Sequence, residues 1–398
     1  MKIAFISVGE LPIPVTVGGA VESLIGNFID QNEIEKEFNI TVYSKYDKVA
    51  IKRIDKYKKT NFNFIKCSKI GNKLYFYYAR IFNKLLNLNL SLRGNYLNKI
   101  LKNLKNKNYD AIIIENDITF VKPIKEISEG KSKIYLHLHN DYLNKNTKNY
   151  KEVIDNCDGI IGVSNFIKNR VLTCKDVNKN SVQVLMNCSD VKRFDIDISN
   201  SEIDILRKKY GINKNDVIIM FTGRLSREKG VDYLIKAFKE IKRDNIKLMI
   251  VGSTWFGSEN ATEFSTELVD LAKEIKEKVI FTGYIEPNSI NKIYKLSDIC
   301  VVPSIWEEPA GLVVIEAMAA GKALLLTNSG GISEYADSNC SIVVDKEKSL
   351  ETNLKTKLEL LIDDVELRNS LGKKGKERSK EFNIENYYKN FSQILRNR

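Results

Sequence analysis

The chain has 398 residues, more than one ordinary hydrophobic core supports, which predicts about two domains. It is 43% hydrophobic and 29% charged, the composition of a soluble globular protein. No run of roughly eighteen apolar residues occurs, and Ile3–Ser7 is too short for a signal peptide, so we expect a cytoplasmic location. The six cysteines lack any C-x-x-C spacing, which argues against a zinc site or a disulfide framework.

The net charge of +12 is concentrated in one segment. Residues 51–108 contain 15 Lys and Arg and one acid, Asp55, whereas the remaining 48 bases and 50 acids nearly balance. Such a segment can bind nucleic acid, an anionic membrane surface or an acidic acceptor, or it can be a solvated lysine-rich surface.

The chain opens with a short apolar run, Lys2–Ser7, then a loop that contains Gly18 and Gly19, and then a helical pattern over Val21–Ile34. A strand, a glycine loop and a helix begin a parallel α/β sheet. The paired glycines let the backbone approach a ligand closely, although a plain turn explains them equally well. The absence of G-x-G-x-x-G argues against a nicotinamide cofactor.

Further buried strands alternate with helical stretches through the first half of the chain. The longest helical stretch, 72–106, interleaves aromatic and basic residues, a pattern that packs on its own sheet or lies on a bilayer surface. The predicted strands are Ile40–Ser44, Asn63–Cys67, Ala111–Glu115, Lys133–Leu138, Gly159–Val163 and Val182–Met186.

Both histidines of the chain, His137 and His139, lie at the carboxyl end of the strand that begins at Lys133. Their spacing of two puts both rings on one side of the strand. Ligands of open α/β sheets bind at carboxyl ends of strands, so we expect His139, at the exit, to meet a ligand. We expect His137 to be a core residue or a support for its neighbour.

A polar linker is expected at 187–200, and its Asp195-Ile196-Asp197 is interpreted as a solvated turn rather than a metal site. A second strand–helix series follows, and the last stretch, 384–398, is an amphipathic helix that could pack on the first domain. The second series of predicted strands is Val217–Phe221, Lys247–Val251, Val279–Thr282, Ile299–Val302, Ala323–Leu326 and Ser341–Val343.

Two stretches of the second series have features that bind phosphate, namely basic residues in a loop after a strand and a helix start between two acids. After the strand at 217–221, Arg224 and Lys229 flank a short loop between glycines. Later, Trp306–Gly321 contains Glu308, then Gly311, then an apolar helix that carries Glu316. Free N–H groups at a helix start bind anions, so this stretch predicts a phosphate between two acids.

The motifs G-R-L-x-x-x-K-G at 223–230 and E-P-x-G-x-x-x-x-E-A-M-A-x-G at 308–321 resemble those of retaining family 4 glycosyltransferases. The resemblance extends over nearly the whole chain. The stretch P-x-P followed by V-x-V-G-G-A-V-E at 12–22 also resembles bacterial glycosyltransferases of spore coats or surface polysaccharides. It implies an α/β GT-B fold, two facing Rossmann-like domains with parallel sheets and a cleft between them. The implied domains are 1–190, completed by helix 384–398, and 191–383.

The resemblance also implies the role of each site residue. Arg224 and Lys229 would hold the donor diphosphate, and Gly311 and Leu312 would add backbone N–H donors. Glu316 would bind the ribose hydroxyls, and Glu308 and His139 would contact the donor sugar. Gly19 would approach the phosphates, and Gly18 and Gly223 would also belong to the donor-binding site. No metal and no cofactor besides the nucleotide sugar, most simply UDP-linked, would be required.

The sequence departs from the family pattern at Cys188-Ser189 and at Ala310, which leaves the donor sugar open. The main hypothesis is a retaining hexosyltransferase acting on a glycan or lipid-linked acceptor, with peripheral membrane contact through 51–108 and no nucleic acid. The alternatives are a nucleotide-sugar-binding protein that acts through its basic segment on membrane or nucleic acid, and a GT-B nucleotide-sugar epimerase.

Overall fold

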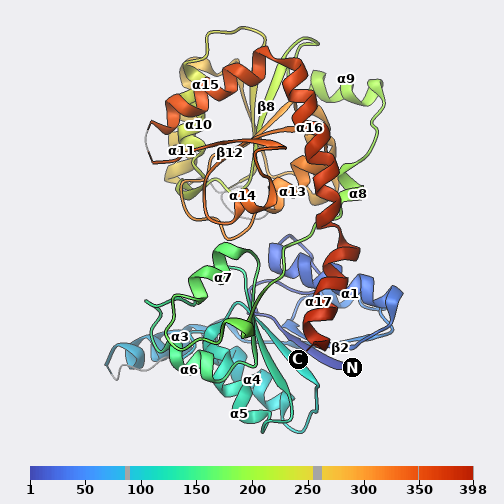
Figure 1. The fold of residues 1–398 in the computed structure, drawn as a ribbon, viewed down its shortest axis with the longest axis vertical. Coiled ribbons are helices and arrows are strands. Elements are labelled where there is room, and N and C mark those ends of the chain that lie inside the picture. Colours follow the sequence, from blue (N-terminus) through green and yellow to red (C-terminus); the bar gives the residue numbers. More distant parts are fainter. Residues whose placement is uncertain (86–89, 254–261, 348, 398) are drawn as a thin grey trace. The chain divides into compact units, whose positions relative to one another are not determined.

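The computed structural model describes residues 1–85, 90–253, 262–347 and 349–397 (Figure 1). The chain forms two compact units: unit 1 comprises Met1–Met186 and Ile384–Arg398, and unit 2 comprises Asn187–Asn383. Unit 2 begins slightly before the boundary expected after residue 190. The reason is local bonding, because the Asn187 N–H donates to the hydroxyl of Tyr335, which belongs to unit 2 (2.9 Å).

Unit 1 is built on a seven-stranded parallel sheet of order β3-β2-β1-β4-β5-β6-β7. Its strands are nearly continuous apolar runs because helices cover a parallel sheet. All seven predicted strands are present, with the third and the last shorter or shifted. The strands are β1 (Lys2–Ile6), β2 (Asn39–Lys45), β3 (Thr60–Ile65), β4 (Ala111–Glu115), β5 (Lys133–Leu138), β6 (Gly159–Gly162) and β7 (Val182–Val184).

The helices of unit 1 follow the strands in sequence, as expected for right-handed parallel α/β connections. The helices are α1 (Ala20–Glu35), α2 (Lys48–Ile51), α3 (Lys69–Leu85), α4 (Gly94–Leu104), α5 (Val121–Ile127), α6 (Tyr150–Asp155), α7 (Asn165–Val171) and α17 (Ile384–Arg396).

The prediction of one helical stretch over 72–106 was wrong, because α3 and α4 are separate helices. Residues 86–89 of that stretch lie outside the described residues. The Asn83 side chain bonds to both the N–H and the carbonyl of Leu90, which replaces helical bonding at this point. Close packing at Gly94 accompanies the turn, since a Cβ there would lie 2.1 Å from the Tyr75 ring.

The C-terminal helix α17 packs on unit 1, which confirms that expectation for its described residues. Phe391 and Tyr388 of α17 lie against Phe28 of α1, with ring centroids 5.1 and 4.8 Å apart. The Tyr388 hydroxyl also donates to Asn32 of α1 (3.0 Å). Phe391 further contacts the ring of His137, at 5.5 Å between centroids. The end of the chain therefore supports the strand that carries both histidines.

Unit 2 contains a six-stranded parallel sheet of order β10-β9-β8-β11-β12-β13, as the second predicted series requires. Its strands are β8 (Val217–Thr222), β9 (Ile246–Val251), β10 (Val279–Gly283), β11 (Ile299–Val302), β12 (Ala323–Thr327) and β13 (Ser341–Val344). Its helices are α8 (Val191–Phe194), α9 (Asn200–Lys209), α10 (Val231–Lys239), α11 (Glu263–Leu271), α12 (Ile290–Leu296), α13 (Leu312–Ala319), α14 (Ile332–Tyr335), α15 (Leu350–Asp363) and α16 (Val365–Ser379).

All six cysteines are unpaired thiols, in agreement with their spacing in the sequence. In the part of the chain that the structure describes, none of the helices combines the length and the apolar character needed to cross a bilayer.

Replacing Phe391 with Ala is expected to destabilise unit 1 by about 3–5 kcal/mol, because a buried aromatic ring leaves a cavity among Phe5, Phe28 and Tyr387. Native-state hydrogen exchange of α1 and β1 amides measures the change. The matched control is Gln393→Ala, at an exposed position of the same helix, which should change stability by less than about 0.5 kcal/mol. Equal protection of α1 and β1 in both variants would show that α17 does not stabilise the sheet.

Candidate functional site

The charged site residues of unit 2 follow two neighbouring strands, β8 and β11. Because paired parallel strands end at the same edge of the sheet, the loops after them meet there. Lys229 ends the short 3-10 helix Arg227–Lys229 after β8, and its Nζ donates to Glu308 Oε1 (2.5 Å). The Ser304 hydroxyl donates to the same oxygen (2.6 Å). The Glu308 side chain is 8% exposed, so a buried carboxylate and a lysine form the centre of this site.

Two glycines allow these loops to come together. A Cβ at Gly230, where φ is +66°, would lie 2.0 Å from the Pro303 carbonyl oxygen. A Cβ at Gly330, where φ is +56°, would lie 2.3 Å from the Glu308 carbonyl oxygen. Both positions therefore require glycine for backbone conformation and for space. The close approach at these two glycines fixes the position of Glu308 relative to Lys229.

Arg224 lies on the surface of the same loop, directly after Gly223, and its side chain is 42% exposed. Its Nη2 contacts Glu228 Oε1 at 3.3 Å, which is an exposed ion pair of small energetic value. A guanidinium has five N–H donors, so most of them remain available for a ligand. In the described structure Arg224 thus pairs with a neighbour, whereas Lys229 pairs with Glu308.

Helix α13 presents its N-terminus three residues after Glu308. Gly311 is the N-cap and Leu312 the first helical residue, and among the described residues no side chain caps this end. The first N–H groups of a helix have no partner within the helix and favour an anion. The backbone N–H groups of Gly311 and Leu312, for which α13 itself offers no acceptor, therefore follow the buried Glu308 by three and four residues in the chain.

Glu316 lies one turn further along α13. Its Oε2 accepts a hydrogen bond from the Tyr294 hydroxyl of α12 (2.9 Å). Burial raises the pKa of Glu316 to about 7, although the Tyr294 bond acts in the opposite direction. Near neutral pH this carboxyl consequently exists in both protonation states, and ligand hydroxyls that donate to it would favour the carboxylate.

In unit 1 the paired glycines precede α1. Gly18 and Gly19 have φ values of +126° and +118°, and Gly19 is the N-cap of α1. A Cβ on Gly19 would lie 2.4 Å from Glu22 Oε2, so the glycine leaves room for this acid. Burial raises the pKa of Glu22 to about 7, and the charges of Glu10 and Glu115 raise it as well.

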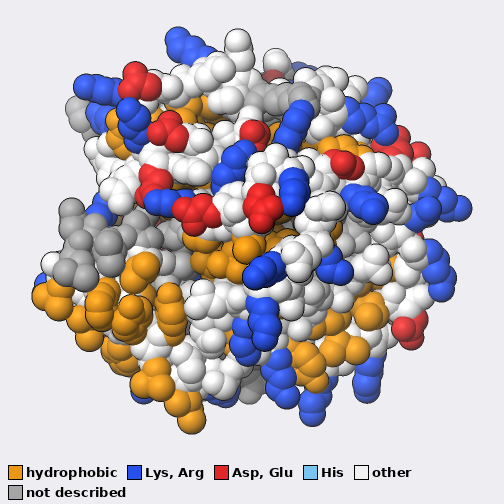
Figure 2. Space-filling model, turned by 90° about the horizontal axis from the view of Figure 1, so that it is seen from below, with side chains coloured by type: hydrophobic (Ala, Val, Ile, Leu, Met, Phe, Trp, Pro, Cys, Tyr) orange, Lys and Arg blue, Asp and Glu red, His pale blue; other side chains and the backbone are white. Residues whose placement is uncertain are grey.

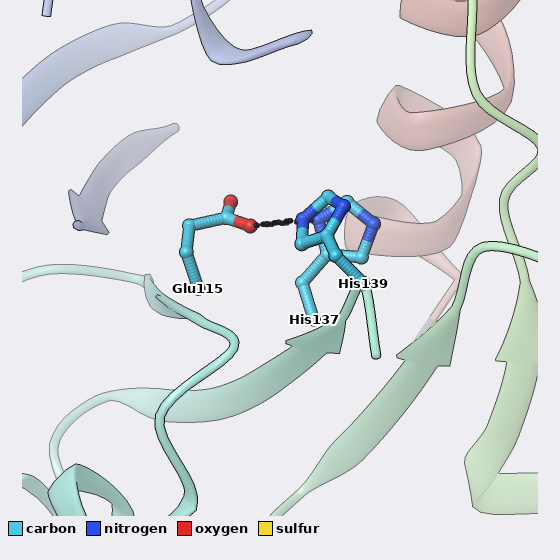
Figure 3. A group of neighbouring side chains, drawn as sticks. All are labelled: Glu115, His137 and His139. Carbon is cyan, nitrogen blue, oxygen red and sulfur yellow. Dashed lines mark hydrogen bonds and ion pairs between the residues drawn. The ribbon is translucent and has the colours of Figure 1, made fainter. Parts of the chain in front are cut away.

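The histidines of unit 1 lie beside Glu115 at the ends of β4 and β5 (Figure 3). The two rings are on the same side of the strand, with centroids 4.2 Å apart, as the spacing predicted. Glu115 Oε2 is 2.8 Å from His139 Nε2 and 3.0 Å from His137 Nδ1. The pairing of Glu115 with His137 across β4 and β5 brings these groups together.

Glu115 and His139 are buried together with His137, and the charge of each of the first two groups depends on these neighbours. Burial alone would raise the pKa of Glu115, but His137 and His139 hold it at about 2. Burial and the neighbouring His137 lower the pKa of His139 to about 4, against the effect of Glu115. At neutral pH Glu115 is therefore a carboxylate and His139 a neutral imidazole whose Nε2–H donates to it, with Nδ1 left as an acceptor.

Sequence reasoning did not select Glu115 or Glu22. An acid at the last position of the predicted strand Ala111–Glu115 is a usable signal, because that end of a parallel strand borders the ligand site. Glu22 offered a weaker signal, an acid in the first turn of a helix after two glycines. Only the spatial pairing with His137 and His139 identifies Glu115 as part of this group.

Among the residues that the structure describes, Glu115, His137 and His139 form a group that could hold a metal ion. Their ligand atoms lie within 4.8 Å of one another, and two histidines with one carboxylate are a known set for Zn²⁺. The hydrogen bond from His139 already uses one Glu115 oxygen. The expectation that no metal takes part in the reaction stays a prediction.

Comparisons with known proteins place this arrangement in context. The family described as glycosyl transferases group 1 matches residues 202–378, all within unit 2. The putative glycosyltransferase YtcC of Bacillus subtilis is 28% identical over 381 residues, which cover 94% of this chain and 86% of YtcC. Spore coat protein SA of the same organism is 25% identical, covering 94% of this chain and 93% of its own.

A solved structure extends the similarity to the whole fold. The Anabaena protein HepE in complex with UDP has a TM-score of 0.77 at 18% identity, and the match covers 100% of both chains. This likeness concerns the fold, two parallel-sheet units of the GT-B type. Unit 2 is therefore similar to the group 1 glycosyltransferases, and nearly the full chain is similar to YtcC and to spore coat protein SA.

Proposed function

We propose that this protein is a glycosyltransferase that moves a sugar, with retention of its anomeric configuration and without a metal, from a UDP-linked donor to a glycan or lipid-linked acceptor. The acceptor would belong to a bacterial surface or spore-coat polysaccharide, made on the cytoplasmic side of the membrane. The observation that carries this proposal is the contact of Lys229 with buried Glu308 beside the uncapped start of α13.

The residues of unit 2 suit the two ends of a nucleotide sugar. Lys229 carries three N–H donors, so it can keep its bond to Glu308 and still contact a diphosphate. Arg224 and the N–H groups at Gly311 and Leu312 would supply further positive charge as the leaving diphosphate gains electrons. Glu316 would accept bonds from ribose hydroxyls, and Glu308 from hydroxyls of the donor sugar.

In unit 1 we assign His139 to the donor sugar, oriented by Glu115. With Nε2–H held by Glu115, the free Nδ1 of His139 can accept a hydrogen bond from a sugar hydroxyl. Gly18 and Gly19 would allow backbone approach to the phosphates. In a retaining reaction the acceptor hydroxyl would attack the anomeric carbon on the face from which the diphosphate leaves and would pass its proton to the departing phosphate oxygen. Neither Glu308 nor Glu316 need then act as a general base.

The names of similar proteins support the choice of donor and product. HepE was solved with UDP, which supports a uridine nucleotide here. Spore coat protein SA supports a role in a coat or surface polysaccharide. A panel of nucleotide sugars, scored for binding and for slow hydrolysis, would identify the donor.

We expect Glu308→Gln and Arg224→Ala each to lower turnover of the identified donor by at least about a hundredfold. Each substitution removes a charged side chain that the proposal assigns to the donor, to its sugar or to its diphosphate. Release of UDP measures turnover, and circular dichroism checks that the fold is intact. The control is Arg227→Ala, an exposed arginine of the same loop that pairs with Glu267, which should retain activity. Wild-type activity in purified Glu308→Gln or Arg224→Ala would contradict the site assignment.

The raised pKa of Glu316, about 7, predicts a pH-dependent affinity for the nucleoside. The ionised carboxylate accepts ribose hydroxyls, so affinity is highest above this pKa and falls as the pH decreases through it, approaching about tenfold per pH unit. Uridine is the suitable probe because it lacks a phosphate that titrates in the same range. Uridine is titrated into the protein at several pH values, and NMR measures its affinity at each. The affinity should decrease with falling pH in the wild type and stay constant in Glu316→Gln. The same pH dependence in both proteins would overturn the assignment of Glu316 to the ribose.

A second proposal concerns contact with an anionic membrane through the basic segment 51–108. One face of α3 exposes apolar side chains, and Figure 2 shows hydrophobic side chains gathered on the side where α3 lies in Figure 1. Basic residues of the same helix border this face, as in helices that lie on bilayers. The exposed apolar residues of α3 are Ile70, Leu74, Phe76, Tyr77, Tyr78, Ile81 and Leu85.

Replacement of Leu74 and Ile81 together with Ser is expected to reduce binding to phosphatidylglycerol vesicles by at least about tenfold, because each buried leucine-sized side chain contributes roughly 1.5–3 kcal/mol. Vesicle flotation measures the bound fraction. Ile34→Ser is the matched control, since Ile34 is 71% exposed on α1 of the same unit. Failure of the wild type to float with these vesicles would remove the membrane proposal.

A further inference from the structure

A cavity of about 390 Å³ lies within unit 1, at the carboxyl ends of β1, β2 and β3. Its walls come from the loop after β1, from the residues that end β2 and follow β3, and from helices α3 and α4. This is the edge of a parallel sheet at which ligands bind. The lining residues are Val8, Gly9, Lys45, Tyr46, Ile65, Lys66, Cys67, Asn72, Phe76, Leu92, Arg93, Asn95 and Tyr96.

The lining contains three cations, Lys45, Lys66 and Arg93, and no carboxylate. Arg93 pairs with Glu10 and with Asp117 Oδ2 (3.2 Å). Lys45 Nζ donates to the Glu10 carbonyl oxygen (2.9 Å), and no ion pair with a described carboxylate involves Lys45 or Lys66. The two lysines therefore leave excess positive charge in the cavity, which favours an anionic ligand.

The remaining walls are suited to a sugar ring. Tyr46, Phe76 and Tyr96 supply aromatic surface, and the Lys66 ammonium lies 5.3 Å from the centroid of the Tyr46 ring. Asn95 donates to Asn72 Oδ1 (2.7 Å), and the amide groups not used in this bond can serve ligand hydroxyls. Gly9 leaves room for the Tyr96 ring in the cavity wall, since a Cβ at residue 9 would lie 2.8 Å from that ring.

The cavity and the Glu115–histidine group occupy adjacent parts of the same sheet edge. Strand β1 lies between β2 and β4, and Glu115 ends β4. The ion pair of Arg93 with Asp117 joins the start of α4 to the residues just after Glu115. A ligand in the cavity is thus held beside the group assigned to the donor sugar.

We propose that this cavity binds the acceptor, and that the acceptor is a saccharide carrying a phosphate group. This inference rests on the proposed function. Lys45 and Lys66 bind the phosphate, the asparagines bind hydroxyls, and the aromatic rings contact the apolar face of the sugar. The phosphate belongs either to a free sugar phosphate or to the head group of a lipid carrier, and the helix that contributes Phe76 to the cavity, α3, also carries the exposed apolar face.

Cys67 provides a local test because its thiol lines the cavity and is partly accessible. The full chain is alkylated with N-ethylmaleimide without nucleotide sugar, and mass spectrometry follows Cys67, with cysteine-free peptides of the same protein as the reference for signal intensity. Glucose 1-phosphate and methyl α-glucoside are compared in solution. A polyprenyl phosphate glucose in phosphatidylcholine vesicles is compared with the same vesicles alone.

A ligand at about four times its Kd occupies most sites and should slow Cys67 alkylation about fivefold. Glucose 1-phosphate or the lipid-linked sugar is expected to do so, and methyl α-glucoside is not. Protection by the vesicle-borne sugar alone would assign the lipid-linked form. Protection by neither phosphate-bearing sugar overturns the proposal, and equal protection by inorganic phosphate overturns its saccharide part.

The double variant Lys45→Met and Lys66→Met should lose this protection, whereas Lys102→Met, an exposed lysine of α4 outside the lining, should keep it. Retained protection in the double variant would contradict the assignment of the phosphate. Hydrolysis of nucleotide sugars by the wild type is measured separately. Its absence would refute the proposed function, while an active enzyme with unprotected Cys67 would refute the acceptor cavity alone.

Discussion

Parallel pairing of the strands is the constraint on which the other features of both units depend. When all strands of a sheet run in one direction, their carboxyl ends and the loops after them meet at one edge. In unit 1 this edge carries Gly19, Glu115, His139 and the cationic cavity. In unit 2 it carries Lys229 and Glu308, on loops that follow neighbouring strands. The residues are therefore far apart in the chain but belong to one edge of each sheet.

Buried charge at these edges is balanced by specific partners. Glu308 accepts hydrogen bonds from Lys229 and Ser304, and Glu115 Oε2 is bonded to His139 and lies 3.0 Å from His137 Nδ1. Removal of one partner from a buried pair typically costs about 3–5 kcal/mol because it leaves a charge uncompensated. These acids are consequently held in fixed positions before a ligand binds, which reduces the reorganisation that a reaction requires. Glu22 and Glu316 are exceptions, because burial raises the pKa of each to about 7, and a ligand whose hydroxyls donate to Glu316 would favour its charged form.

The excess positive charge of the chain has a location that agrees with the proposed chemistry. Residues 51–108 supply α3 and α4, Lys66 and Arg93, so the same segment provides an exposed apolar face and part of a cationic cavity. An acceptor with a phosphate and a lipid carrier would use both features. The C-terminal helix α17 packs on the same sheet, where Phe391 contacts Phe5 of β1 and His137 of β5.

The sequence alone determined the two series of buried parallel strands, because apolar runs such as Ala111–Glu115 are local signals, and it selected Lys229, Glu308 and Glu316 through their motifs. It did not separate α3 from α4, since the bonds of Asn83 to Leu90 interrupt a pattern whose periodicity continues. The grouping of Glu115 with the two histidines and the cavity that contains Lys45 and Lys66 depend on contacts between residues distant in the chain. Only the tertiary structure decided them, because strand order and register fix which side chains become neighbours, and neither is encoded in a local pattern.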